Sequence, residues 1–147
     1  MLVRDLMTTE VVTLQETDTL LDASLIFVRS TLRHVPILRG KQLVGVVTER
    51  DVKRFTPSVL SGITPNEYNQ LMETTPLSKV MTRNPLTMKP DEPVRGAART
   101  FSTQKIGCLP VVESGEVVGI LTTTDMLKLL GRLLEGQTEA AGESPFP

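Results

Sequence analysis

The sequence predicts an α+β fold made of two β-α-β-β-α units, related by a pseudo-two-fold axis, with helices packed on one face of each small sheet. Two observations carry this prediction. Residues 3–54 align with residues 77–128 without a gap, and both copies show the same order of strand and helix signals. A chain of 147 residues is long enough for two such units that share a core.

The identical pairs of this internal alignment are collinear and run from the start of the unit to its end. They indicate that one unit has been duplicated. The pairs are Met7-Thr8 with Met81-Thr82, Thr13 with Thr87, Ala23 with Ala97, Phe27 with Phe101, Pro36 with Pro110, Val44-Gly45 with Val118-Gly119, Thr48 with Thr122, and Asp51 with Asp125.

Each unit begins with a short β-prone segment, and a helix follows after Asp18-Thr19 or Glu92-Pro93. Two apolar strands then flank a turn at Gly40 or Gly115, and a second helix closes the unit. The expected strands are 11–14, 35–38 and 43–47 in the first copy, and 86–88, 109–112 and 117–121 in the second.

We expect a first repeat at 1–55, a linker at 56–76, a second repeat at 77–135 and a disordered tail at 136–147. In the linker, Thr64-Pro65-Asn66-Glu67 supplies the N-cap, first-turn proline and N3 glutamate of a helix running to about Met72. The tail has too little apolar content to offset the entropy of ordering it.

Composition argues against several classes of function. A net charge of −1, 3% aromatic residues and no tryptophan give no signature of nucleic-acid binding. No run of eighteen apolar residues and no basic-then-apolar leader is present, so we expect no membrane contact. A single cysteine, Cys108, and a single histidine, His34, provide neither a disulfide nor a zinc site, which favours a cytoplasmic protein without a metal.

Nothing in the sequence matches a known catalytic motif. A Gly-x-Ser-x-Gly elbow, a P-loop and a His-Glu-x-x-His helix are all missing from it. We therefore expect no enzyme activity, no catalytic residues and no catalytic cofactor.

The most informative motif is Gly45 to Asp51, repeated as Gly119 to Asp125, where a strand turns into a helix. Each copy has the pattern Gly-hydrophobic-hydrophobic-Thr-x-x-Asp. A Thr-x-x-Asp sequence at a helix start is also an ordinary capping arrangement, and duplication copies a cap as readily as a binding site. The motif alone leaves both interpretations open.

Together with Met-Thr at the start of each unit and a hydrophobic-Pro-hydrophobic strand before each hairpin, this motif resembles the CBS-domain family, named from cystathionine β-synthase. The resemblance covers residues 3–54 and 77 to about 130. It implies an adenosine compound whose ribose is held by Thr48 with Asp51 and by Thr122 with Asp125. It further implies contacts to the adenine, or positions lining the same cleft, at Thr13, Arg33, His34, Val35 and Pro36, and at Thr87, Gly107, Cys108, Leu109 and Pro110.

The two copies differ in charge at these positions. Arg33, His34 and Arg50 in the first copy align with Gly107, Cys108 and Thr124 in the second. Because Arg and His can make charge-assisted hydrogen bonds to phosphate, we expect a phosphorylated nucleotide at the first site. The second site then binds more weakly, takes an uncharged adenosine derivative or stays empty. Solvated surface roles for the arginines remain open, as does a contribution from Lys105 or Lys128 of the other repeat.

The resulting hypothesis is a regulatory module that senses AMP, ADP, ATP or a related compound such as S-adenosylmethionine or NAD. The alternative is a structural or interaction scaffold with vestigial nucleotide sites. The first helix of copy one is apolar nearly all round and the C-terminal helix is rich in leucine, so we expect a homodimer formed through helices. An unidentified effector protein would respond to ligand binding. The layout also resembles stand-alone CBS proteins of the acetoin-utilisation type.

Overall fold

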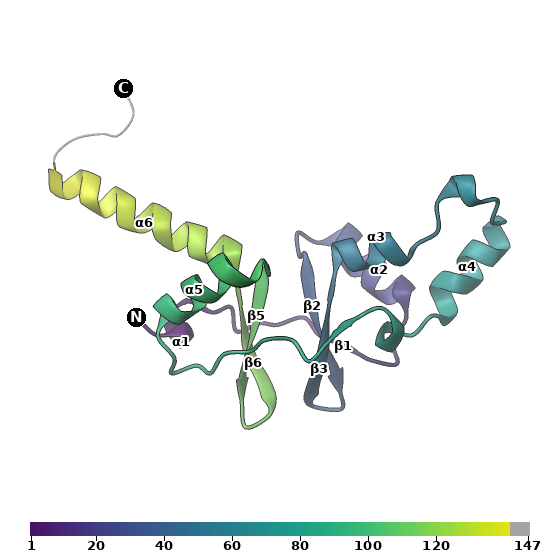
Figure 1. Cartoon of the computed structure of the whole chain (residues 1–147), viewed down its shortest axis with the longest axis horizontal. Helices are drawn as coiled ribbons and strands as arrows, with labels where there is room; N and C mark the ends of the chain where they lie inside the picture. Colours follow the sequence, from purple (N-terminus) through teal and green to yellow (C-terminus); the bar gives the residue numbers. More distant parts are fainter. Residues whose placement is uncertain (142–147) are drawn as a thin grey trace.

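The computed structural model describes residues 1–141, which form two lobes, each a β-hairpin with helices on its outer side (Figure 1). The predicted α+β fold with two repeats is confirmed. The first lobe contains β1 (Leu14–Gln15), α2 (Leu20–Arg29), β2 (His34–Arg39), β3 (Gln42–Thr48) and α3 (Glu49–Phe55). The second contains α5 (Val94–Gln104), β5 (Cys108–Glu113), β6 (Glu116–Thr122) and α6 (Thr123–Ala141).

The segment between the lobes is largely regular. It holds two short 3₁₀ turns, η1 (Val59–Ser61) and η2 (Leu77–Lys79), with α4 (Pro65–Thr74) between them and β4 (Thr82–Arg83) at the end. Thr64 caps α4 by accepting a hydrogen bond from the Glu67 amide at 3.2 Å. Helix α4 packs against α2, and its Met72 is buried in the first core. The apolar α2 therefore finds part of its second surface within this chain.

The hairpins turn through two-residue loops whose glycines have positive φ. Gly40 (φ +62°) is the first loop residue in one, whereas Ser114 (+52°) and Gly115 (+82°) are both left-handed in the other. These backbone angles suit the tight turns that match the twist of paired strands. The hairpin tips meet at Gln42 and Glu116, so the strands form one continuous sheet in the order β1-β2-β3-β6-β5. This junction is an addition to the two separate sheets that the sequence suggests.

Each lobe is completed by the segment that precedes the other lobe. The N-terminal α1 (Val3–Leu6) packs on the second lobe, where Val3 is fully buried and its amide donates to the Glu92 carbonyl at 2.8 Å. Reciprocally, Leu77 is buried in the first core and its amide donates to the Asp18 carbonyl at 2.8 Å. The spatial lobes thus exchange their leading segments relative to the sequence repeats.

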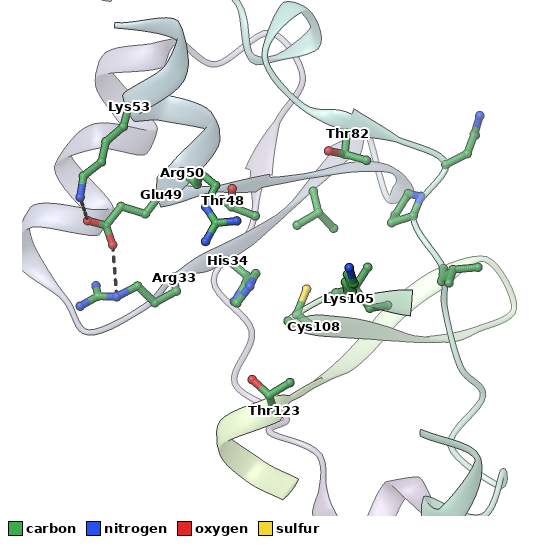
Figure 2. A pocket seen from close by; sticks show the side chains of 16 residues that line it. Arg33, His34, Thr48, Glu49, Arg50, Lys53, Thr82, Lys105, Cys108 and Thr123 are labelled. Atoms are coloured by element: carbon green, nitrogen blue, oxygen red, sulfur yellow. Dashed lines mark ion pairs between the residues drawn. The ribbon is translucent and has the colours of Figure 1, made fainter. Parts of the chain in front are cut away.

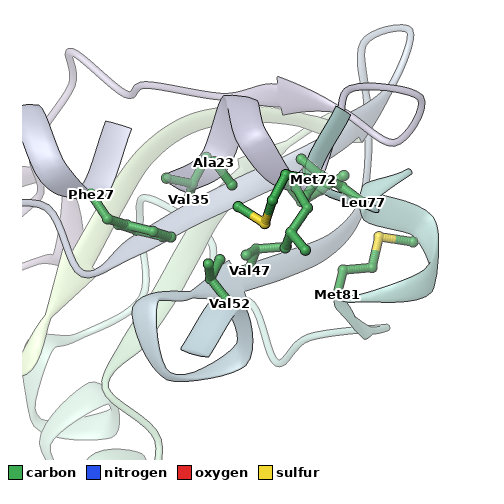
Figure 3. Close-up of a cluster of buried hydrophobic side chains, with 10 residues drawn as sticks. Ala23, Phe27, Val35, Val47, Val52, Met72, Leu77 and Met81 are labelled. Atoms are coloured by element: carbon green, nitrogen blue, oxygen red, sulfur yellow. The ribbon is translucent and has the colours of Figure 1, made fainter. Parts of the chain in front are cut away.

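Each lobe has its own apolar core between the sheet and the helices. Figure 3 shows the first core, where Phe27 from α2 and Val35 and Val47 from the hairpin point toward one another. The buried members of the first core are Leu20, Ala23, Phe27, Val35, Ile37, Val47, Val52, Met72, Leu77 and Met81. Those of the second are Val3, Met88, Ala97, Leu109, Val111 and Leu121.

The repeated Met-Thr and Val-Gly pairs meet in space through this exchange. A β-carbon on Gly45 would lie 2.6 Å from the Met81 sulfur and 2.8 Å from the Thr82 carbonyl oxygen. A β-carbon on Gly119 would lie 2.5 Å from the Met7 sulfur and 3.1 Å from the Thr8 carbonyl oxygen. Only glycine leaves room for the crossing segment, which explains why these identities recur together in both copies.

The structure differs from the predicted disordered tail over its first part. Helix α6 continues to Ala141, whereas the sequence predicts disorder from residue 136; the rest of the predicted tail, 142–147, lies outside the described residues. That prediction rests on apolar content alone. Glu135, Gln137 and Ala140 are good helix formers, and extending an existing helix adds a hydrogen bond for each residue ordered.

We expect Gly45→Ala to lower the free energy of unfolding by about 1–3 kcal/mol, because the added methyl displaces the Thr82 backbone. Gly131→Ala is the matched control, since Gly131 lies inside α6 with open space where a β-carbon would be. That substitution should raise stability by about 0.5–1 kcal/mol through helix propensity alone. Urea denaturation of both variants tests this, and equal effects would contradict the close approach at Gly45.

Candidate functional site

A cavity of about 840 Å³ lies between the two lobes and is lined by sixteen residues (Figure 2). On one side it meets the junction of β3 and α3, with Thr48 and Arg50. On the other it meets the start of β5, with Gly107 and Cys108, and the crossing segment 84–86. Strand β4 brings that segment into place by pairing with β3, where Thr82 faces Val46.

The Thr-x-x-Asp motifs form complete capping boxes. The Thr48 amide donates to Asp51 Oδ2 at 2.9 Å, and the Asp51 amide donates to Thr48 Oγ1 at 3.0 Å. Thr122 and Asp125 form the same box, with distances of 2.8 and 3.3 Å. The capping interpretation is therefore correct for these atoms. Asp51 Oδ1 takes part in no hydrogen bond among the described residues, and Asp51 itself is not one of the residues that line the cavity.

A third capping box shows that this geometry does not by itself mark a binding site. Thr19 and Asp22 form it at the start of α2, with the Thr19 amide donating to Asp22 Oδ2 at 2.9 Å. Neither residue lines the cavity. Any claim on ligand binding has to rest on the surroundings of Thr48 and Asp51 instead.

The cavity gathers residues from both predicted sites. Arg33, His34, Thr48 and Arg50 of the first site and Gly107 and Cys108 of the second line it together. The other predicted residues are not among the lining side chains: Thr13, Val35, Pro36, Asp51, Thr87, Leu109, Pro110, Thr122 and Asp125. Val35 and Leu109 are fully buried in the two cores, so the structure does not expose them to the cavity.

Sequence reasoning missed much of the lining. Lys53 follows Arg50 by three and Glu49 by four positions on α3, so helical spacing from the predicted Arg50 would have indicated Lys53. Residues 84–86 line the cavity only because the segments cross, and no local sequence pattern predicts that crossing. The lining residues outside the predicted set are Val46, Glu49, Lys53, Thr82, Asn84, Pro85, Leu86, Lys105, Ile106 and Thr123, of which the sequence pointed only to Lys105.

The cavity has an excess of positive charge. Glu49 is its one acidic side chain and holds two cations: Arg33 Nε lies 3.1 Å from Oε2, and Lys53 Nζ lies 3.0 Å from Oε1. The hydrogen bond from Lys53 and the charge of Arg33 lower the pKa of Glu49, so it is ionised at neutral pH. Arg50 and Lys105 also line the cavity and make no ion pair with any described residue. This arrangement suits an anionic ligand.

His34 contributes shape rather than charge. A β-carbon on Gly107 would lie 2.6 Å from His34 Nε2, so the glycine lets the imidazole of one lobe pack against the backbone of the other. Burial lowers the pKa of His34 below 6.5, against a smaller opposing effect of Asp51. The ring is therefore mainly neutral at pH 7 in the protein without a ligand.

Cys108 is equally unsuited to carry charge. The side chain is buried, and burial raises the pKa of its thiol to about 12. At neutral pH the sulfur is protonated, which is the unreactive form. Among residues 1–141 no group of three or more His, Cys, Asp or Glu side chains could hold a metal ion, and no helix is long and apolar enough to cross a membrane.

Comparison with known proteins gives one family throughout. The CBS domain family model matches residues 3–57 and 77–132. The structure is similar to that of AcuB, a putative acetoin utilization protein of Vibrio cholerae, with 35% identity and a TM-score of 0.77 over 95% of this chain and 96% of that one. It is also similar to the CBS domain pair of protein MJ0100 in complex with 5′-methylthioadenosine and S-adenosyl-L-methionine, with 29% identity and a TM-score of 0.72 over 89% and 96%.

Sequence relatives include both small and larger proteins. A CBS domain-containing protein of Dictyostelium discoideum is 30% identical over 91% of this chain and 94% of its own length. Protein MJ1225 of Methanocaldococcus jannaschii is 35% identical, but the chain spans 42% of it. A homoserine O-acetyltransferase of Methanococcoides burtonii is 30% identical, and the chain spans 24% of it. The chain thus spans less than half the length of the first curated relatives it matches.

The lowered pKa of His34 makes stability depend on pH. Between pH 6.5 and the folded pKa, the unfolded imidazole binds a proton that the folded one excludes, so stability falls as pH drops through this window. We expect the free energy of unfolding to fall by less than about 1.4 kcal/mol per pH unit, which is the limit for the uptake of one proton. Urea denaturation at pH 7.5 and 5.5 measures it, and His34→Gln should weaken the dependence. An unchanged dependence in that variant would show that another group is responsible.

Proposed function

The chain belongs to the CBS domain family, and we propose that it is a regulatory module that binds an adenosine compound between its two lobes and performs no chemistry itself. The observation that carries the proposal is the cavity, which joins Thr48 at the start of α3, a group of basic side chains and an apolar wall in one space. The similar MJ0100 domain pair holds 5′-methylthioadenosine and S-adenosyl-L-methionine, which supports this class of ligand.

We propose that aliphatic side chains hold the adenine. Val46, Leu86 and Ile106 line the cavity from both lobes, and none of its sixteen lining residues is Phe, Tyr or Trp. The ribose hydroxyls would then donate hydrogen bonds to Asp51 Oδ1, while Oδ2 keeps the hydrogen bond from the Thr48 amide. Thr48 and Asp51 keep this role as a proposal, in line with the family resemblance.

The charges favour a phosphorylated ligand, AMP, ADP or ATP, over an uncharged adenosine derivative. Arg50 from the first lobe and Lys105 from the second both line the cavity, so a phosphate group could engage one cation from each. S-adenosylmethionine and NAD share the adenosine part and belong in the same binding test. The Thr122–Asp125 turn has Gly107 and Thr124 where the first has Arg33 and Arg50, so we propose weaker or no binding of phosphates there.

A ligand that contacts both lobes would act by biasing their relative orientation. Such a bias requires different contacts in the two arrangements, and an effector protein would read the change by its own differential affinity. His34 is placed to take part, because its ring packs on the Gly107 backbone of the opposite lobe at the cavity wall.

A scaffold with vestigial sites is the second candidate. It is favoured by the three similar capping boxes, since the one at Thr19 and Asp22 lies away from the cavity and needs no ligand to explain it. In this case the basic side chains of the cavity would be solvated surface groups. Binding of adenosine compounds separates the two candidates.

We further propose that two copies associate through α6. Leu127, Leu130 and Leu133 are 67%, 49% and 57% exposed, and the helix runs away from the second lobe (Figure 1). An antiparallel pair of α6 helices centred between Gly131 and Arg132 would bring Leu130 of one copy beside Leu133 of the other. This register buries apolar surface of both copies between the two helices.

A thermal-shift titration with ADP tests the ligand site. Wild-type protein should gain stability as RT ln(1 + [L]/Kd), and Asp51→Ala should lose this gain. Because Asp51→Ala also removes a helix cap worth about 1 kcal/mol, Asp22→Ala is the matched control: it removes an equivalent cap away from the cavity. Asp22→Ala and Asp125→Ala should both retain the ADP shift.

Two results would count against the sensor. A wild-type protein that shows no shift with AMP, ADP, ATP, 5′-methylthioadenosine, S-adenosylmethionine or NAD would favour the scaffold. An ADP shift that persists in Asp51→Ala would remove Asp51 from the site.

The dimer proposal is tested by light scattering after gel filtration. Leu130→Ser combined with Leu133→Ser should convert a dimer to a monomer, because the change removes apolar contacts from both sides of the pair. Val28→Ser is the control, since Val28 is 80% exposed on α2, away from α6. A wild-type monomer, or a dimer unaffected by the double substitution, would refute pairing through α6.

A further inference from the structure

Arg33, Glu49 and Lys53 form a chain of ion pairs on the wall of the cavity (Figure 2). Each oxygen of the Glu49 carboxylate is engaged by a different cation, at 3.1 and 3.0 Å. The three residues come from two places in the first lobe: Arg33 immediately precedes β2, and the other two lie one turn apart on α3.

This set of linked ion pairs occurs in one copy of the repeat and not in the other. The positions of the second copy that align with Arg33, Glu49 and Lys53 are Gly107, Thr123 and Leu127, so all three charges are missing together. The second lobe nevertheless forms the same hairpin and helices. The fold therefore does not need the ion pairs.

The ion pairs are not explained by a contribution to the stability of the fold. The side chains of Arg33 and Lys53 are 59% and 75% exposed, and exposed pairs of this kind contribute little to folding. Their position does have a consequence for binding, because an anionic ligand entering the cavity meets two of its four cations already paired with a carboxylate. A phosphate group has to share Arg33 and Lys53 with the Glu49 carboxylate, which repels it, whereas an uncharged adenosine compound meets no such repulsion.

We propose that Glu49 is a specificity-determining residue that competes with the ligand's phosphates for Arg33 and Lys53. This inference rests on the proposed function. Glu49 lowers affinity for phosphorylated adenosine ligands and leaves uncharged ones unaffected, so it sets how strongly the module distinguishes them. Arg50 and Lys105, which have no ion pair among the described residues, attract the phosphate first.

Isothermal titration calorimetry with ADP and 5′-methylthioadenosine tests the proposal on wild-type protein, Glu49→Gln and Glu16→Gln. Glu49→Gln should tighten ADP binding roughly fivefold, the scale of an exposed ion pair, and leave the dissociation constant of 5′-methylthioadenosine unchanged. Glu16→Gln is the matched control, since Glu16 pairs with Arg39 and lies outside the cavity lining. It should leave the dissociation constants of both ligands unchanged.

A third variant separates competition from a direct contact between Glu49 and the ligand. Arg33→Met with Lys53→Met removes the cations that Glu49 would release, so in this background Glu49→Gln should no longer change the dissociation constant of ADP. Weaker ADP binding in Glu49→Gln, or equal changes for both ligands, would overturn the role of Glu49. If neither ligand binds any variant, wild type included, the proposed function itself fails.

Discussion

The structure depends on two crossing segments, each of which leaves its own repeat to complete the core of the other. Val3 is buried with Leu109 and Leu121, and Leu77 and Met81 are buried with Val35 and Val47. A lobe separated from its partner would lose a buried part of its core. This exchange explains why two units of about fifty residues, each too small to bury a large core, form a stable pair.

The cavity follows from the same constraint. The crossing segment can pair with β3 only because Gly45 has no side chain, and the paired segment then continues as residues 84–86 along the cavity wall. The wall therefore contains parts of both lobes and of the connection between them. A molecule bound there would contact each part that moves when the lobes reorient, which is the property a sensor requires.

The sequence allowed most helices and the two hairpins to be predicted because their signals are local. The first strand of each copy was predicted less well: β1 covers Leu14–Gln15 and not 11–14, and residues 86–88 form only an isolated bridge from Met88 to Val111. Thr-x-x-Asp caps, glycine turns and alternating apolar strands depend on neighbours within a few residues, and the repeat supplied each signal twice. The exchange could not be predicted in this way. Met7 and Met81 occupy equivalent positions in their repeats. Either segment could therefore pack on either lobe as far as the sequence shows, and the three-dimensional path of the chain determines which lobe each one completes. The site prediction had the same limit: it placed Arg33 and Gly107 in separate sites, whereas the crossing brings them to one cavity.

The two copies differ in charge at the cavity but keep their apolar character at the aligned core positions. Aligned core positions keep their character, as Ala23 with Ala97, Val35 with Leu109 and Ile37 with Val111 show. Aligned cavity positions change charge, as at Arg33 and Gly107 or Glu49 and Thr123. Packing explains the first group, since a core position accepts only apolar side chains of suitable volume. No such demand acts on the second group, so a symmetric fold can carry an asymmetric distribution of charge. That asymmetry places three of the four basic side chains of the cavity, Arg33, Arg50 and Lys53, on the first lobe and leaves Lys105 as the one from the second.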